Sequence, residues 1–93
     1  MVEISQHARR RMQKRSIPPI VLDWLQDYGS RQYDGRGAFI QYFDHAAKAR
    51  LSRNYGHRFV QTHDRYLRVY MVEDTAGEAV ITVGHRTRRV RRR

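Results

Sequence analysis

The sequence contains no cysteine and few acidic residues. The absence of cysteine excludes disulfide bonds, thiolate zinc sites and a cysteine nucleophile. There are 19 Lys and Arg residues against 9 Asp and Glu residues, which gives a formal net charge of +10. Lysine is itself scarce, because 17 of the 19 cations are arginine. The planar guanidinium group suits phosphate oxygens, so this composition predicts a polyanionic partner, with RNA or DNA as the default.

Long hydrophobic segments are also missing. No apolar run approaches the roughly 20 residues that a membrane-spanning helix needs, and no apolar segment typical of a secretory signal follows Met1. We therefore expect no membrane contact and a cytoplasmic location. The hydrophobic content of 40% is enough for a small core in 93 residues. The sequence predicts a single domain over residues 1–93 that includes a basic C-terminal arm at residues 86–93.

The N-terminal third of the chain predicts two helices. Ser5 is a suitable N-cap and apolar residues recur after it at helical spacing, so a first helix should run to about Arg15. Two consecutive prolines then interrupt it. Because proline is favoured in the first turn of a helix, a second helix should begin near Pro19 and end at Gly29. Trp24 lies on its apolar stripe and is assigned to the core.

The middle of the chain predicts a hairpin and a third helix. Residues 31–34 and 38–43 alternate as in strands, and a glycine-rich tight turn separates them. Asp44 should cap a short helix that ends at Gly56, and a loop over the same residues is the alternative.

The C-terminal half predicts three further strands. Residues 59–62 suggest a short one, and residues 66–73 alternate clearly, with Leu67, Val69 and Met71 on one face. After a turn, residues 78–85 should return as the antiparallel partner. Helices followed by such strands predict an α+β fold, in which the N-terminal helices pack on one face of a twisted antiparallel β-sheet.

The uncovered face of that sheet is the first candidate binding surface. On this face the strand at residues 66–73 should present Tyr66, Arg68 and Tyr70. Arginine can hold phosphates and aromatic rings can stack on bases, so the face fits RNA. The alternative is an ordinary solvated face of an antiparallel sheet.

Two of the five histidines are placed for chemistry. His7, Arg11 and Arg15 follow each other at intervals of four residues and should share one side of the first helix. His85 and Arg86 end the last predicted strand, and His85 should face the helix side of the sheet. His7 and His85 are therefore expected to meet at one rim.

Imidazole and guanidinium groups at one place fit RNA cleavage without a metal. The 2′-OH attacks its own phosphate, so a base must take its proton, an acid must protonate the 5′-oxygen, and cations must stabilise the developing charge. Imidazole, with an unperturbed pKa near 6.5, can act as base or acid, and arginine supplies fixed positive charge. We assign His7, His85, Arg11 and Arg86 to catalysis. A His7–His85 contact that only fixes the helix to the sheet is the alternative.

Further residues are assigned to RNA binding. Arg68 and Tyr70 should seat a flanking nucleotide, and the same role is given to Arg15, Thr82, Arg88 and Arg89. The arm at residues 86–93 contains six arginines and is expected to grip phosphates, with a solvated tail as the alternative. No HExxH or phosphate-loop motif occurs, so we expect no metal and no cofactor.

Two motifs lie near the ends of the chain, and the N-terminal one is moderately specific. Residues 5–17 contain S-x-H-A-x-x-R-M-x-x-R-x-I, and residues 81–89 contain I-T-V-G-H-R-T-x-R. They resemble a family of small bacterial domains of unknown function that are grouped with the RelE-type toxins, in the wider barnase–EndoU–colicin–RelE fold. The resemblance implies metal-independent RNA cleavage and an antitoxin that covers the basic cleft. Its motif positions are His7, Arg11, Arg15, Thr82, His85 and Arg86.

These observations predict a toxin-type endoribonuclease that acts on RNA, in solution or on the ribosome, as part of a toxin–antitoxin pair. The first alternative is a non-catalytic RNA- or ribosome-binding module that uses the same basic face. The second is an interaction domain whose basic surface binds an acidic protein.

Overall fold

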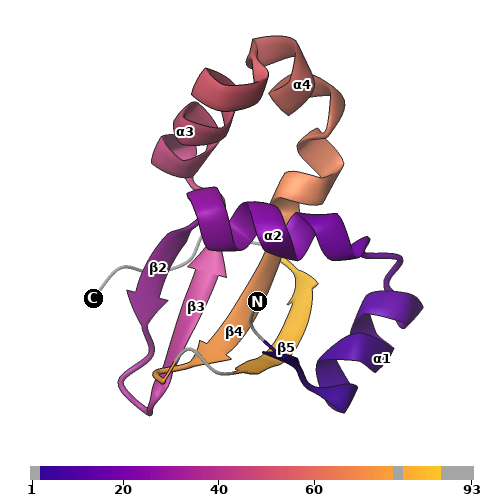
Figure 1. Cartoon of the computed structure of the whole chain (residues 1–93), viewed down its shortest axis with the longest axis vertical. Coiled ribbons are helices and arrows are strands. Elements are labelled where there is room, and N and C mark those ends of the chain that lie inside the picture. The colour runs from indigo at the N-terminus through magenta and orange to yellow at the C-terminus, as the bar shows by residue number, and fades with distance from the viewer. Residues whose placement is uncertain (1–2, 77–78, 87–93) are drawn as a thin grey trace.

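The computed structural model describes residues 3–76 and 79–86. Within them, short groups of helices and of strands follow one another along the chain (Figure 1). The strands are β1 (Glu3–Ile4), β2 (Ser30–Tyr33), β3 (Ala38–Tyr42), β4 (Val69–Asp74) and β5 (Ala79–His85). The α-helices are α1 (Gln6–Lys14), α2 (Pro19–Tyr28), α3 (His45–Tyr55) and α4 (His57–Thr62), and a 3₁₀ helix, η1 (Asp64–Arg68), leads into β4.

All five strands belong to one sheet in the order β1-β5-β4-β3-β2. The pairs β2–β3, β3–β4 and β4–β5 are antiparallel, whereas β1 is parallel to β5. The α+β fold class is therefore confirmed, but the sheet is mixed and the prediction of a purely antiparallel sheet is wrong. Strand β1 could not be predicted, because a strand of two residues is too short to show alternation.

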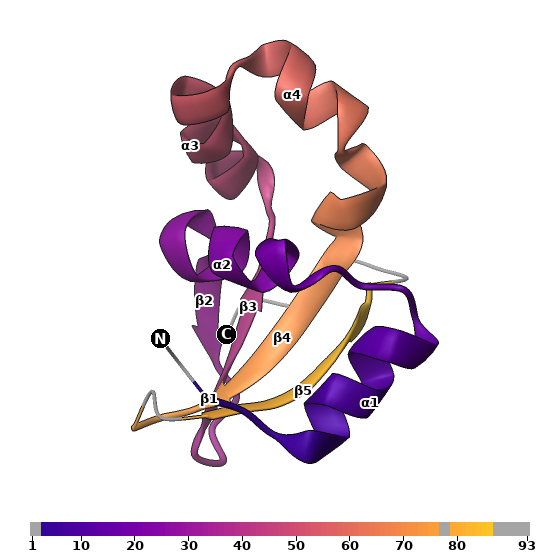
Figure 2. The ribbon, with the colours of Figure 1, turned by 45° about the vertical axis from the view of Figure 1, so that its right-hand side comes forward.

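The core lies between the sheet and the helices. Helix α2 crosses the inner face of the sheet, α1 lies beside β5, and α3 and α4 extend beyond the end where β3 finishes and β4 begins (Figures 1 and 2). Side chains from all these layers share one apolar cluster, which includes Ala8, Met12, Val21, Leu25, Phe43, Leu51, Met71 and Val83. Trp24 is buried in the same cluster, as predicted.

Local signals placed three helix starts and one hairpin correctly. The side chain of Ser5 accepts a hydrogen bond from the N–H of Ala8, and Asp44 accepts one from Ala47 in the same way. These N-caps satisfy backbone donors that a helix leaves free in its first turn. Helix α2 begins at Pro19, and β2 and β3 form the predicted hairpin.

Two predicted strand segments are wrong. Residues 59–62 lie in α4, because Phe59 packs edge-on against Trp24 with ring centroids 5.3 Å apart, and this packing overrides the strand preference of phenylalanine and valine. Residues 66–68 belong to η1, so β4 begins at Val69. The apolar positions predicted on that strand, Leu67, Val69 and Met71, are all buried.

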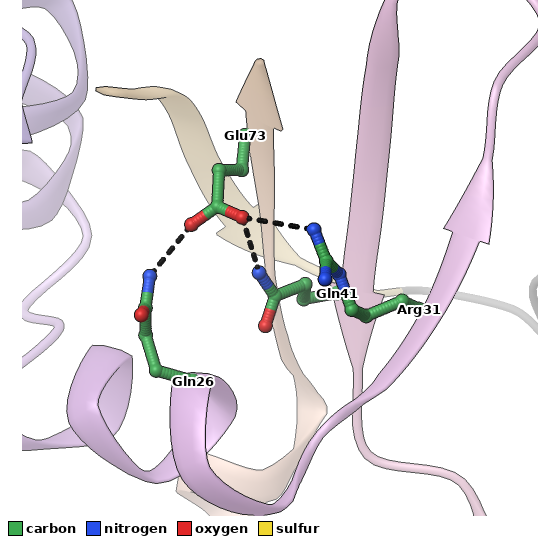
Figure 3. Close-up of polar contacts among 4 residues, drawn as sticks. All are labelled: Gln26, Arg31, Gln41 and Glu73. Atoms are coloured by element: carbon green, nitrogen blue, oxygen red, sulfur yellow. Dashed lines mark hydrogen bonds and ion pairs between the residues drawn. The ribbon is translucent and has the colours of Figure 1, made fainter. Parts of the chain in front are cut away.

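A buried carboxylate ties α2 to three strands. Glu73 is 3% exposed and points to the inner face of the sheet, between α2 and the neighbouring strands (Figure 3). One of its oxygens accepts hydrogen bonds from Gln41 at 3.0 Å and Arg31 at 3.3 Å, and the other accepts one from Gln26 at 2.6 Å. Polar side chains from α2, β2, β3 and β4 therefore satisfy one another's hydrogen bonds. They do so at a buried position of β4 that an apolar side chain would otherwise occupy.

Replacing Glu73 by alanine should lower the free energy of unfolding by about 3 kcal/mol. The substitution leaves the buried amide of Gln41 without its acceptor and removes the counter-charge of Arg31. Chemical denaturation checks this. The matched change Glu3→Ala, at an exposed site, should stay within about 0.5 kcal/mol, and equal effects of the two substitutions would contradict the assigned role of Glu73.

Candidate nucleic-acid interface

Helix α1 covers the free edge of β5. The short strand β1 pairs only with the first two residues of β5. Beyond them, the Ser5 hydroxyl donates to the carbonyl oxygen of Ile81 at 3.0 Å, and Arg11 Nε donates to that of Val83 at 2.7 Å. These bonds satisfy carbonyl groups that an edge strand leaves unpaired. They also fix α1 alongside β5, with both elements running in the same direction (Figure 2).

The two predicted catalytic histidines lie at different levels of this pair of elements. His7 belongs to the first turn of α1, beside the start of β5, whereas His85 is the last residue of β5. Strand residues advance about 3.3 Å each and helix residues about 1.5 Å, so His7 and His85 are offset by roughly 10 Å along β5. By the same spacing, Lys14 at the end of α1 and its C-cap Arg15 lie nearest to the level of His85. Both histidines are exposed.

A β-bulge changes the alternation of β5. Thr82 pairs with Val72, but the next pair joins Glu73 to Val80, so Ile81 is the additional residue and is 43% exposed. Ile81 is therefore not on the core side of β5, on which the buried Val83 lies. His85 is paired with the buried Val69, which places it on the helix side as predicted.

Gly84 makes room for a side chain of the protein itself. Tyr70 pairs with Gly84 across the two strands, and a Cβ atom at residue 84 would lie 3.0 Å from the Cε1 and hydroxyl atoms of the Tyr70 ring. The ring therefore lies against the Gly84 backbone. Tyr70 thus occupies the space that the absent side chain of Gly84 leaves.

Arg86 joins the ends of three strands. Its backbone N–H donates to the carbonyl oxygen of Arg68 at 2.6 Å, and its guanidinium donates to that of Phe43 at 3.0 Å. The same guanidinium lies 5.4 Å from the centroid of the Tyr42 ring. A guanidinium has five N–H donors, so Arg86 can hold the strand ends and still contact a phosphate.

Arg68 does not share a strand face with Tyr70. It lies at the end of η1, and its guanidinium is 3.7 Å from a carboxylate oxygen of Asp64, with the Arg68 side chain 69% exposed. Tyr66 belongs to the same short helix and contacts His63. The predicted stripe of Tyr66, Arg68 and Tyr70 along one strand is therefore wrong, because the strand begins only at Val69.

The most concentrated positive charge of the described residues lies on α1. No acidic residue occurs between Ser5 and Leu22. The ion pairs that the described residues form among themselves involve Arg31, Lys48 and Arg68, and none involves a cation of α1. We call the exposed cations of this helix and its C-cap the α1 face, which consists of Arg9, Arg10, Lys14 and Arg15.

Three residues of the α1 face were not assigned a role from the sequence. Arg9, Arg10 and Lys14 lie off the interval of four residues that joins His7 to Arg11 and Arg15. The available signal was the run of five cations within seven residues, without an acidic residue to balance it. Arg15 is the one predicted RNA-binding residue that belongs to this face.

Some predictions fall outside the described residues. Arg88 and Arg89 belong to the basic arm, of which only Arg86 is described, so their role stays a prediction. In residues 3–76 and 79–86, no three His, Asp or Glu side chains gather in a way that could hold a metal ion. Over the same residues, every helix is too short or too polar to cross a membrane.

Comparison with known proteins adds no relative. The chain matches no protein-family model, no curated protein and no solved structure. The similarity to RelE-type toxins therefore stays a prediction from the two sequence motifs, and what the structure establishes is an α+β domain with a mixed five-stranded sheet.

The contact between Gly84 and Tyr70 can be tested by a double-mutant cycle. Gly84→Ala should lower the free energy of unfolding by about 1–3 kcal/mol, because the added methyl group displaces the ring. In a Tyr70→Ala background the same substitution should cost much less. Chemical denaturation of the four proteins gives the coupling energy, and additive effects within about 0.5 kcal/mol would contradict the contact.

Proposed function

We propose that this protein binds RNA through the α1 face and the adjoining end of β5. The observation that carries the proposal is the set of exposed cations on α1, which have no ion-pair partner among the described residues. Ser5 and Arg11 fix this helix to the sheet, so the charges are held at set positions. Arginine groups held in this way suit the phosphates of a nucleic acid.

The end of β5 extends this surface. His85 and Arg86 follow directly along the strand, and Lys14 and the C-cap Arg15 of α1 lie at about the same level. The cations of α1 therefore extend along the sheet edge to the exposed imidazole of His85. Support for RNA rather than DNA comes from the motif similarity. The same charges suit an acidic antitoxin, which would then compete with RNA for the α1 face.

A charge reversal on α1 should weaken RNA binding. We expect Arg10→Glu to lower the affinity about tenfold at moderate salt, and to reduce the slope of log affinity against log salt by about 1, because one phosphate contact is lost. Fluorescence anisotropy with a labelled oligoribonucleotide at several salt concentrations measures both quantities.

The matched control is Arg36→Glu, which makes the same charge change. Arg36 is exposed in the turn between β2 and β3, on the hairpin at the opposite edge of the sheet from β5. The Arg36→Glu substitution should leave the affinity for RNA and the slope of log affinity against log salt almost unchanged. Equal losses in the two variants would show that net charge alone acts, and a wild-type protein that binds no RNA at low salt would overturn the proposal.

We further propose that RNA is cleaved at the end of β5 without a metal, as in a toxin-type endoribonuclease. The specific support is the exposed His85 beside Arg86. Arg11 is held nearby by its hydrogen bond to the carbonyl oxygen of Val83. An imidazole there can take the 2′-OH proton or protonate the leaving 5′-oxygen. The guanidinium groups stabilise the charge that develops on the phosphate oxygens.

The offset between the histidines separates their expected roles. His85→Ala should reduce kcat by 100-fold or more, whereas His7→Ala, about 10 Å away along β5, should mainly raise KM. Cleavage of a labelled RNA in EDTA measures both constants. His45→Ala, an exposed histidine at the start of α3, is the control and should leave both unchanged. Cleavage that persists at the wild-type rate in His85→Ala would contradict the assignment.

A further inference from the structure

Four rings form a column along α4 and its two ends. Tyr55, Phe59, His63 and Tyr66 follow at intervals of four, four and three residues, close to successive turns of a helix. Their centroids are 4.7, 4.2 and 6.3 Å apart, and successive planes are inclined by 21°, 34° and 33°. We call this set the ring column. The Tyr55 and Phe59 rings are stacked, and the two following steps of the column are tilted.

The surrounding structure holds the ring column in place. Helix α3 ends at Gly56, whose φ of 97° lets the chain turn and begin α4 directly afterwards, with Tyr55 stacked on Phe59. From α2, the buried Trp24 contacts Phe59 edge-on at 5.3 Å and His63 edge-on at 5.7 Å. Trp24 therefore packs against the two middle rings of the column and holds them against α2.

The two ends of the ring column differ. At one end the guanidinium of Arg65 lies 4.7 Å above the Tyr66 ring and donates to the Tyr66 hydroxyl at 2.6 Å. At the other end Tyr55 is 47% exposed, although Tyr28 contacts it at an interplanar angle of 78°. One end is thus already covered by a cation, and the other presents aromatic surface to solvent.

The two helices that meet at Tyr55 carry more cations than anions, and one carboxylate, that of Asp27 in α2, also acts on Tyr55. Residues 45–63 contain four Lys and Arg residues and no acidic residue. Lys48 pairs with Asp64 and Arg50 bonds to the Tyr28 carbonyl, but Arg53 and Arg58 are exposed and form no ion pair with another described residue. The Tyr28 phenol, followed by desolvation, raises the pKa of Tyr55 above its ordinary value. A tyrosine with its ordinary pKa near 10 is already uncharged at neutral pH, so the exposed ring does not repel phosphates.

We infer that Tyr55 is a stacking site for an unpaired nucleobase, with Arg53 and Arg58 contacting the flanking phosphates. Exposed aromatic rings beside cations bind single-stranded nucleic acids in this way, with little sequence preference. The inference rests on the proposed RNA-binding function and adds a second contact to it. This contact lies on the arm formed by α3 and α4, at the other end of the molecule from α1 (Figure 1). An RNA with an unpaired segment should therefore bind more tightly than a duplex.

The test compares Tyr55→Ala with Tyr55→Phe, which keeps the ring. The ligands are an adenine-rich oligoribonucleotide and an oligomer of the same length with the same phosphates but no bases. Tyr55→Ala should weaken binding of the first ligand about tenfold and leave binding of the abasic oligomer unchanged. Tyr55→Phe should stay within about twofold of wild type for both ligands, since stacking needs the ring and not the hydroxyl. A 2-aminopurine base in the first ligand should lose fluorescence on binding only when residue 55 is aromatic.

Each failure has a distinct pattern. If Arg10→Glu weakens RNA binding but Tyr55→Ala does not, the stacking site is wrong and the proposed RNA-binding function stands. If wild type binds no RNA at low salt, both are wrong. Equal losses for the abasic oligomer would also overturn stacking. Tyr55→Leu, which retains an apolar contact with Phe59, should behave as Tyr55→Ala does, so a loss of folding in the alanine variant does not decide the result.

Discussion

The arrangement of this domain depends on how the edge of β5 is covered. An edge strand exposes carbonyl groups, and β1 is too short to pair with more than the first part of β5. Beyond β1, side chains of α1 and its N-cap bond to the edge instead. Ser5 donates to the carbonyl oxygen of Ile81, and Arg11 donates to that of Val83. Arg11 therefore satisfies a backbone carbonyl group of β5 and also contributes positive charge to the surface. Because α1 is held in this position, its remaining cations lie together along one side of the sheet and lead to the end of β5.

Much of the fold could be predicted because its signals are local. The N-caps Ser5 and Asp44, the proline that opens α2 and the hairpin turn each depend on a few neighbouring residues, and all are observed. The misses depend on distant partners. β1 exists only because β5 lies beside it, and residues 59–62 are helical because Phe59 packs against Trp24. A strand preference over four residues cannot outweigh such packing.

The candidate site was predictable in composition but only partly in geometry. The sequence showed that His85 and Arg86 end a strand, and they do. It could not show the register between α1 and β5, which two long-range hydrogen bonds determine and which offsets His7 from His85. The ring column was hidden for a related reason. Its members are spaced as on a helix, but the segment was interpreted as a strand, and the turn at Gly56 that joins α3 to α4 gives no periodic signal.

The contacts that fix α1 have a consequence for the order of assembly during synthesis. They join residues 72 and 76 positions apart in the chain, so α1 has no edge to dock on until β5 has emerged from the ribosome. The hairpin of β2 and β3 and the helices α2 to α4 can form earlier from nearby contacts. A nascent chain would therefore carry the arginines of α1 before it could arrange them, and the cationic surface would be organised only at the end of translation of this domain.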